Sequence, residues 1–428
     1  MASSTRPALV LAAAAIGAGC ASGGNDSPGG DAAVVVDAGP DAGTDAGTDA
    51  GAQPTCVAPT TPGSCAAPVG TALPICKLSL TGCMDPQDIT RFSSRAVYYE
   101  INSPLWSDNA AKARAFVLPA GGTIHVKSCQ PGADPASLAE CVSPTGLPSG
   151  PADTGRWVFP VGTVMIKNFL FDGKRVETRL LMRVDAATAA IIQNGTDWVG
   201  YNYAWNEAQT EATVVPNART QVRFNTGAQT VTWSYPSFFD CISCHNRTVG
   251  TLGPETAQMN RTVNGNNQID AFASLGLFDS TAPARPYAEP LVEPYANAAL
   301  GLQGPGPGAT VEQAARSYLS ANCGFCHRPD VNDQGFDLRH LLSLSETRIC
   351  NLMQQNGIPG MTDQMLVDLK PGDHTASAAW LRMNIPASDP GGRADVGRMP
   401  PVASAVVDPQ ATALIGSWID SLSSCPTQ

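Results

Sequence analysis

The chain has 428 residues, of which only 15% are charged while 41 are Gly and 35 are Pro. This composition favours loop-rich modules over coiled coils and long helical bundles. The formal net charge of -11 and the lack of any basic block exclude the electrostatic footprint of a nucleic-acid-binding protein. Thirteen cysteines indicate an oxidising compartment or cysteine-bound cofactors.

Residues 1–19 have the pattern of a signal peptide. Met1–Arg6 carries one positive charge, and Leu9–Ala15 is an apolar run too short to cross a membrane. The stretch Ile16–Cys20 resembles the lipobox of bacterial lipoproteins, which implies that Cys20 carries lipid. The alternative is an ordinary signal peptide cleaved nearby. Ala21, directly after the cysteine, resembles lipoproteins sorted to the outer membrane.

Residues 20–55 are predicted to be a disordered tether. Positions 21–55 hold six Asp and no Lys or Arg, with a near-repeat of Asp-Ala-Gly-Thr around residues 41–51. Such a segment cannot bury enough apolar surface to fold. The resemblance and the tether together imply an exported protein that is lipid-anchored in the outer membrane.

Two stretches have the pattern C-x-x-C-H, at Cys241–His245 and at Cys323–His327. This is the attachment signature of c-type haem. Two thiols about one helical turn apart can add to the two vinyl groups on one porphyrin edge, and the next imidazole reaches the iron. The sequence therefore predicts two covalently bound haem groups, held by Cys241, Cys244, Cys323 and Cys326, with His245 and His327 as iron ligands.

Two alternative interpretations of these motifs are a zinc site and a redox-active dithiol. The two C-x-x-C pairs lie roughly 80 residues apart, which is far from the spacing of a zinc ribbon. A redox dithiol does not need two copies, each followed by His. Both alternatives fit less well than haem.

Eight further cysteines remain, and an even number fits four disulfides in an exported protein. Cys129 and Cys141 bracket a Pro/Gly-rich insertion and are expected to pair. Cys350 and Cys425 are the two left in the C-terminal region and are expected to pair there. The other four, Cys56, Cys65, Cys76 and Cys83, allow three connectivities that the sequence leaves open.

Residues 309–428 are predicted to form an all-α module. Apolar spacing predicts a helix over Thr310–Ser320, and a second over Asp408–Leu422 that Asp408 caps. A helix running into C-x-x-C-H and a C-terminal helix crossing it resemble the class I cytochrome c fold.

The segment around Met399-Pro400 resembles the axial methionine loop of that family, which implies Met399 as the second iron ligand. Met383 is a rival, although its helical context is also that of a core residue. His340 and His374 are further alternatives. A thioether ligand favours ferrous iron and suits electron transfer.

Residues 56–262 are predicted to form a Cys-rich lead-in and a β-rich module, followed by a linker at 263–308 that contains Gly301–Gly308. Asp172-Gly173 is expected to form a hairpin turn. Strands are expected at 98–105, 115–118, 123–127, 156–159, 163–171, 176–184, 198–205, 221–224 and 230–233. The fold class is therefore multidomain α+β, with the β-rich module before the helical one.

The stretch Phe159–Lys167, the segment from Asp197 to Tyr203 and Cys241–His245 resemble the all-β haem c family. That family includes hydroxylamine-oxidising cytochromes with a lysine–haem cross-link and cytochrome c′-beta. The resemblance implies that Lys167 faces or cross-links the haem, which makes it the candidate catalytic residue. The alternative is an outward-facing strand lysine, which is the commonest environment for Lys.

Other residues of the β-rich module have open roles. Met259 could be a sixth iron ligand or a packing residue. Arg179, Arg183, Glu177 and Asp108 are candidates for a distal pocket, and His125 is interpreted as a surface histidine.

The segment Asn102–Asp108 with Lys112 and Arg114, Trp205–Glu207 and the paired motifs resemble a wider group of exported bacterial dihaem cytochromes. The sequence favours electron transfer by a tethered dihaem c-type cytochrome, with redox proteins of the periplasm or outer membrane as partners.

One alternative is a haem redox enzyme, peroxidase-like or oxidising small nitrogen species, at an open haem of the β-rich module. Another is a structural or sensor lipoprotein that binds a gas. Enzymatic activity therefore stays open.

Overall fold

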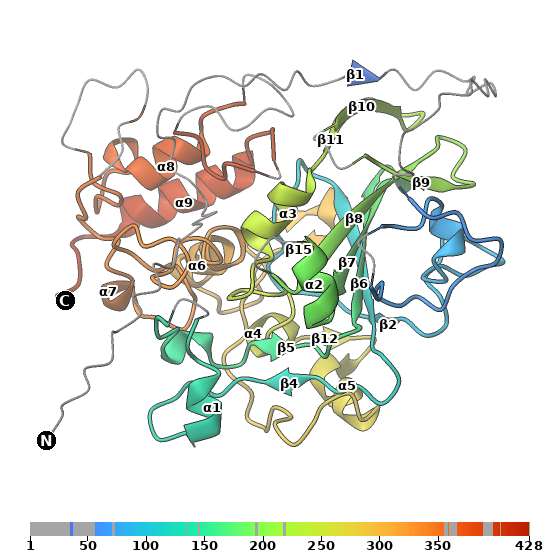
Figure 1. Ribbon diagram of the computed structural model, residues 1–428. Helices are drawn as coiled ribbons and strands as arrows, with labels where there is room; N and C mark the ends of the chain where they lie inside the picture. Colours follow the sequence, from blue (N-terminus) through green and yellow to red (C-terminus); the bar gives the residue numbers. More distant parts are fainter. Residues whose placement is uncertain are drawn as a thin grey trace, which may run out of the picture.

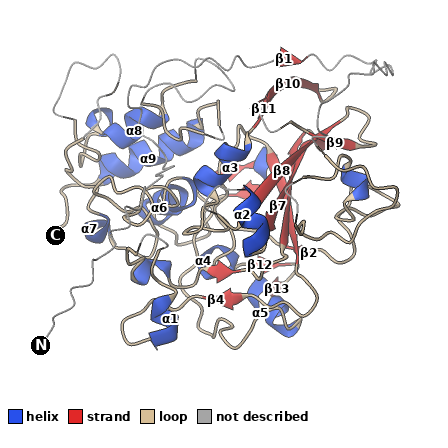
Figure 2. Ribbon diagram, in the orientation of Figure 1, coloured by secondary structure: helices blue, strands red, loops and turns tan. Residues whose placement is uncertain are grey.

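The structure is a computed structural model that describes residues 35–36, 56–70, 73–133, 135–143, 146–192, 196–216, 220–354, 358, 366–387, 397–402 and 404–427. A β-rich part is followed by a helical part, as Figures 1 and 2 show. The predicted mixture of sheet and helix is therefore confirmed. The predicted signal peptide, Cys20 and all of the predicted tether except Val35–Val36 lie outside the described residues.

The central sheet has the strand order β2-β3-β6-β7-β8-β9, and every neighbouring pair runs antiparallel. Asp172 and Gly173 join β6 to β7 and have φ angles of 50° and 77°. Positive φ at both positions is what a type I′ hairpin requires, so the predicted turn is confirmed. The strands are β2 (Val97–Tyr98), β3 (Ala111–Val117), β6 (Val164–Phe171), β7 (Lys174–Arg183), β8 (Trp198–Trp205) and β9 (Ala212–Val214).

Shorter strands surround this sheet. β10 (Thr220–Asn225) and β11 (Thr230–Tyr235) form a hairpin, and β1 (Val35–Val36) pairs with β10 in parallel. The remaining pairs are β4 (His125–Val126) with β5 (Trp157–Val158), β12 (Thr262–Val263) with β13 (Asn266–Asn267), and β14 (Ala296–Asn297) with β15 (Leu302–Gln303).

The predicted strand at 98–105 is wrong beyond Tyr98. The backbone N–H groups of Asn102 and Ser103 donate to the carbonyl and side-chain oxygens of Gln258, at 3.1 and 2.8 Å, instead of to a neighbouring strand. This segment leaves the sheet and crosses toward the helical part. The other predicted strands lie where strands are observed, with ends that differ by a few residues.

The helical part is organised by α6 (Val311–Asn322) and α9 (Pro409–Ser421), which confirms both predicted helices. Asp408 caps α9 by accepting from the N–H of Ala411 at 3.0 Å. Ala315 and Leu319 of α6 share a buried core with Ile415, Trp418 and Ile419 of α9. α7 (Leu344–Thr347) and α8 (Ala378–Met383) complete this part.

The remaining helices belong to the β-rich part. They are α1 (Pro135–Ala139), α2 (Ala186–Ile192), α3 (Phe238–Cys244), α4 (Thr256–Met259) and α5 (Gln268–Ser274), with 3-10 turns at Leu78–Leu80, Pro151–Asp153 and Ala298–Leu300 and, in the helical part, at His374–Ala376. No helix of the described ranges combines the length and apolar character needed to cross a membrane.

Residues 263–308 differ from the expected linker, because they pack on the β-rich part. Ile269 and Phe272 of α5 are almost fully buried, in one cluster with Trp157 and Phe159. Their apolar side chains fix this segment to the sheet.

Four disulfides join cysteines that both lie within the described residues. Cys129–Cys141 and Cys350–Cys425 confirm the predicted pairs. The connectivity that the sequence left open is Cys56–Cys76 and Cys65–Cys83.

A buried charge network joins the two parts. The guanidinium of Arg328 is fully buried and contacts Asp153 at 2.9 Å and Asp330 at 2.5 Å. Ser149 donates to Asp330 at 2.6 Å, and its carbonyl accepts from Arg339 at 2.7 Å. Burial raises the pKa of Asp153, but Arg328 and further cations outweigh this and hold the pKa well below its ordinary value. The helical part is therefore fixed against the β-rich part.

Candidate cofactor sites

The first C-x-x-C-H motif lies on α3 and at its C-terminal end. A capping box starts this helix: Ser237 accepts from the N–H of Asp240, and the Asp240 carboxylate accepts from the N–H of Ser237 at 2.8 Å. The helix packs on β8, where a Cβ added at Gly200 would lie only 3.0 Å from the Cys241 sulfur. A glycine at this position is therefore what allows the motif to sit so close to the sheet.

His245 is held in one tautomer. Its Nδ1 lies 2.8 Å from the carbonyl oxygen of Gly250, and a carbonyl can only accept, so Nδ1 carries the proton. Burial, with help from nearby Lys167, lowers the pKa of His245 to about 3. The imidazole is therefore neutral, with the Nε2 lone pair free to bind a metal.

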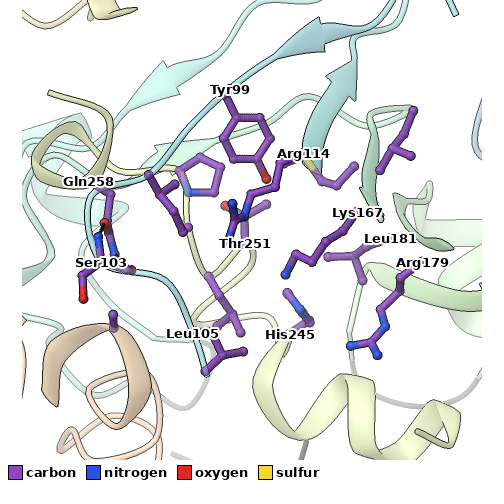
Figure 3. A pocket seen from close by; sticks show the side chains of 17 residues that line it. Tyr99, Ser103, Leu105, Arg114, Lys167, Arg179, Leu181, His245, Thr251 and Gln258 are labelled. Carbon is purple, nitrogen blue, oxygen red and sulfur yellow. Dashed lines mark hydrogen bonds between the residues drawn. The ribbon is translucent and has the colours of Figure 1, made fainter. Parts of the chain in front are cut away.

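Two clefts meet at this histidine, and Leu105, Lys167, Arg179, His245 and Leu252 line both. The first, which we call the sheet lobe, spans about 650 Å³, part of it open to solvent, between β3, β6, β7 and the segments 101–105 and 251–254; Figure 3 shows it. The second, which we call the cysteine lobe, spans about 950 Å³, also partly open to solvent, and is lined by Cys241 and Cys244 as well. The described chain thus gathers both thiols and the imidazole of one motif around a single space.

Lys167 projects from β6 into this space. In Figure 3 its amine lies close to the imidazole of His245. Burial, together with Arg114 and Arg179, lowers the pKa of Lys167 to about 7. The outward-facing alternative is therefore wrong, and a position of Lys167 against a haem stays a prediction.

The other distal candidates separate into two groups. Arg179 lines both lobes and forms a bidentate pair with buried Glu177, with both contacts at 3.0 Å, and Asp108 lines the cysteine lobe. Arg183 instead pairs with Asp197 at 2.8 Å, away from both lobes. Met259 is fully buried in the apolar core and lines neither lobe, so it is a packing residue.

His125 is tied into a local ion cluster. Its two ring nitrogens contact Glu140 at 2.6 Å and Asp279 at 2.9 Å, and the side chain is about one-quarter exposed. It lies outside both candidate sites.

A smaller cleft of about 370 Å³ lies at the second motif. Cys323, Met399 and Met383 all line it. Both methionines that were proposed from the sequence therefore face the same space as Cys323, the first cysteine of the second motif. His340 and His374 are not among the lining residues, and His374 is bonded to Asp420 at 2.7 Å.

Arg398 shapes the methionine loop. Its guanidinium, only 2% exposed, donates to the carbonyls of Ile385, Pro400 and Ser404 at 3.0, 2.7 and 2.8 Å. Nothing in the sequence singled this residue out, apart from its place next to Met399.

His327 is less well positioned than His245 to bind a metal. Its ring stacks on Phe336 at 4.7 Å, its Nδ1 is buried without a partner among the described residues, and it does not line the cleft. Cys326 is disulfide-bonded. The second site therefore fits a haem only after that disulfide opens and the imidazole turns toward the cleft.

A thin wall separates the two sites. Leu105 lines the lobes at His245, while the next residue, Trp106, lines the cleft at Cys323. In the same way, Ala321 of α6 lines the sheet lobe, and the next residue, Asn322, lines the cleft at Cys323. The Asn322 side chain accepts from the Trp106 N–H at 2.6 Å, which ties the two halves of the wall together.

Asp108 connects the first site to the methionine loop. Its carboxylate accepts from the N–H groups of Ala405 and Val406 at 2.8 and 2.9 Å, and Trp106 donates to the Val406 carbonyl at 2.9 Å. The sequence marked the segment 102–108 only through a resemblance, because contacts across about 300 positions leave no local pattern.

Comparisons with protein-family models, with curated proteins and with solved structures each found no match. Within the described ranges, no group of three or more His, Cys, Asp and Glu side chains is arranged to hold a metal ion.

Proposed function

We propose that this chain is an exported dihaem c-type cytochrome, lipid-anchored in the outer membrane, that transfers electrons between redox proteins. The observation that carries the proposal is the arrangement at the first motif. His245 has its tautomer fixed by Gly250, and its ring borders the space lined by Cys241 and Cys244. A neutral imidazole with a bonded second nitrogen is the usual state of a metal-ligating histidine.

In this proposal Cys241 and Cys244 would hold the first haem and His245 would be a ligand of its iron. Cys323 and Cys326 would hold the second once the disulfide at Cys326 has opened, with His327 and Met399 as ligands. A haem, when bound, supplies reversible one-electron chemistry at its iron. The protein holds the ligands in place, through the Gly250 carbonyl at one site and the Arg398 hydrogen bonds at the other.

The thin wall supports a relay function. Leu105 and Trp106 are consecutive, and each faces a different candidate site. Buried ion pairs such as Arg328 with Asp153 hold the two parts in a fixed arrangement. Two redox centres in such an arrangement can exchange electrons inside one chain, while the acidic charge and a tether suit brief docking with partners.

The experiment is the haem content of the mature protein produced with a cytochrome c maturation system. We expect two covalent haems by pyridine haemochromogen absorbance and intact mass. Replacing Cys241 and Cys244 by Ala should remove one, and replacing Cys323 and Cys326 should remove the other. Removal of Cys129 and Cys141 is the matched control and should leave both haems in place. A wild-type protein without covalent haem would contradict the proposal.

A second candidate is a haem redox enzyme that acts at the first site on a peroxide or a small nitrogen species. The position of Lys167 beside His245 favours it, because a lysine in this position matches the cross-linked family. Peptide mapping distinguishes the two candidates. A haem peptide that joins Lys167 to the Cys241–His245 segment supports the enzyme, whereas an unmodified Lys167 supports the relay.

A further inference from the structure

Three cations lie side by side across three neighbouring strands of the central sheet. Arg114 of β3 is the register partner of Lys167 of β6, and Lys167 is the register partner of Arg179 of β7. All three line the sheet lobe, as Figure 3 shows. We call Arg114, Lys167 and Arg179 the cationic row.

Such a row costs stability in the absence of a counter-charge. Side chains directly opposite each other on antiparallel strands are about 4.5–5.5 Å apart at Cβ, and like charges at that distance destabilise the pair. Burial increases the cost, because a charge removed from water needs a partner.

Only Arg179 has an anionic partner in the described part of the chain, the bidentate carboxylate of Glu177. Arg114 is 7% exposed, and its guanidinium makes no hydrogen bond or ion pair with any described residue. Lys167 likewise forms no such contact with described residues; its amine lies 5.9 Å from the Phe169 ring centre. Neither Arg114 nor Lys167 therefore has a described carboxylate in hydrogen-bonding contact at the lobe.

A polar group without a partner lies in the same lobe. The hydroxyl of Ser103, on a fully buried residue, has no hydrogen-bond partner in the described structure. The Tyr99 side chain, 5% exposed, also lines the space. Hydroxyl donors and cations that line one lobe are groups that recognise a carboxylate or an oxyanion.

We propose that the cationic row is an anion-binding site, which takes carboxylate or small oxyanion groups in the sheet lobe. The site rests on the proposed function, since the lobe borders His245. Two sources offer this chemistry: the propionates of the first haem, which would bring carboxylates to the row, and a free oxyanion entering the lobe.

The test compares Arg114→Gln and Lys167→Gln with the wild type in the haem-loaded mature protein. Arg223→Gln on β10 and Lys174→Gln at the start of β7 are the matched controls, because both residues lie outside the lobe. The probe is sodium nitrite, titrated by calorimetry. The second readout is the midpoint potential of the first haem as a function of pH. Arg114→Lys, which keeps the charge, should restore most of the wild-type behaviour.

A free oxyanion as ligand predicts that nitrite binds the wild type and binds about tenfold more weakly to each lobe variant, as expected for loss of one charge-assisted hydrogen bond. Propionates as ligands predict no nitrite binding. They also predict a lower potential of the first haem in both variants, because removing a cation disfavours the reduced haem. The pH at which this potential changes should rise, because removing a cation also disfavours the ionised carboxylate and so raises its pKa.

Either pattern supports the anion site and identifies its source. The proposal is overturned when both lobe variants match their controls in nitrite affinity and in potential. Failure of the proposed function is seen separately, as a wild type without covalent haem; nitrite titration of that protein still tests the row. When Arg114→Gln does not fold by circular dichroism, Lys167→Gln gives the same comparison.

Discussion

Replacing Arg328 by Leu should destabilise the whole protein, because it leaves two buried carboxylates without their main partner. Arg328 is fully buried and contacts Asp153 and Asp330, and the Asp153 side chain is itself fully buried. Removing one partner of a buried ion pair costs about 3–5 kcal/mol. With an unfolding entropy of about 2.1 cal/mol/K per residue over the roughly 340 described residues, this lowers Tm by about 4–7 °C.

The free energy of unfolding lost in Arg328→Leu should be larger at neutral pH than at acidic pH. The pKa values of Asp153 and Asp330 are held below their ordinary values, with burial opposing and Arg328 among the groups that lower them. Their contribution is therefore present above the unfolded pKa of about 3.9 and is lost as pH falls toward the lower folded values. The gap between wild type and variant should be widest at neutral pH and narrow below about pH 4.

The assay is equilibrium urea unfolding followed by far-ultraviolet circular dichroism from pH 3 to 8. Arg223→Leu, an exposed strand arginine, is the control and should change the free energy of unfolding by less than about 0.5 kcal/mol. The double variant with Asp153→Asn should recover part of the loss, since it removes one unpaired charge. A loss below about 1 kcal/mol for Arg328→Leu at pH 7 would refute this account of how the two parts are held together.

Three further predictions concern the candidate sites. Gly200→Val should displace α3 from the sheet, because even a Cβ atom at this position would lie only 3.0 Å from the Cys241 sulfur. The free energy of unfolding, measured with urea, should fall by about 1–3 kcal/mol, and an unchanged urea midpoint would contradict this. Met399→Leu should lower the potential of the second haem and abolish the near-infrared band of methionine-ligated ferric haem, whereas Met383→Leu should do neither; the reverse result would assign Met383 as ligand. Arg398→Gln should weaken the same band through disorder of the loop, and an unaltered spectrum would show that its hydrogen bonds do not position Met399.

Local patterns account for much of what the sequence predicted. The hairpin at Asp172-Gly173 and the cap at Asp408 depend on a few adjacent residues, so the sequence alone predicted them. Two disulfides followed from position alone, whereas Cys56–Cys76 and Cys65–Cys83 needed the fold.

Features that depend on distant contacts were missed. The segment after Tyr98 has the composition of a strand, but its backbone N–H groups donate to Gln258 instead of to a neighbouring strand, and the segment runs toward α6. Ile269 and Phe272 lie in the range 263–308, which was predicted to be a linker on the strength of the Gly/Pro-rich segment Gly301–Gly308 at its end, and only the core that they join reveals their packing role. Arg114 and the Leu105–Trp106 wall were marked in the sequence only by a family resemblance, because their environments are formed by neighbours from several distant segments.

The environment of Lys167 is the most instructive case. Alternation along β6 cannot say which face of a sheet will meet a cofactor site, and lysine is usually exposed. The resemblance to a family only kept the inward-facing alternative open beside the commoner exposed one, and the structure places Lys167 in the cleft at His245.

The optical spectrum of the purified mature protein, oxidised and reduced, with and without carbon monoxide, tests the central proposal most directly. The relay account predicts two c-type haems, both low-spin and both unreactive toward the gas, which for the first haem requires a second iron ligand beside His245 that Met259 does not supply. A protein without a haem spectrum would contradict the account altogether. One high-spin haem that binds carbon monoxide would contradict the relay and leave the enzyme as the function of the first site.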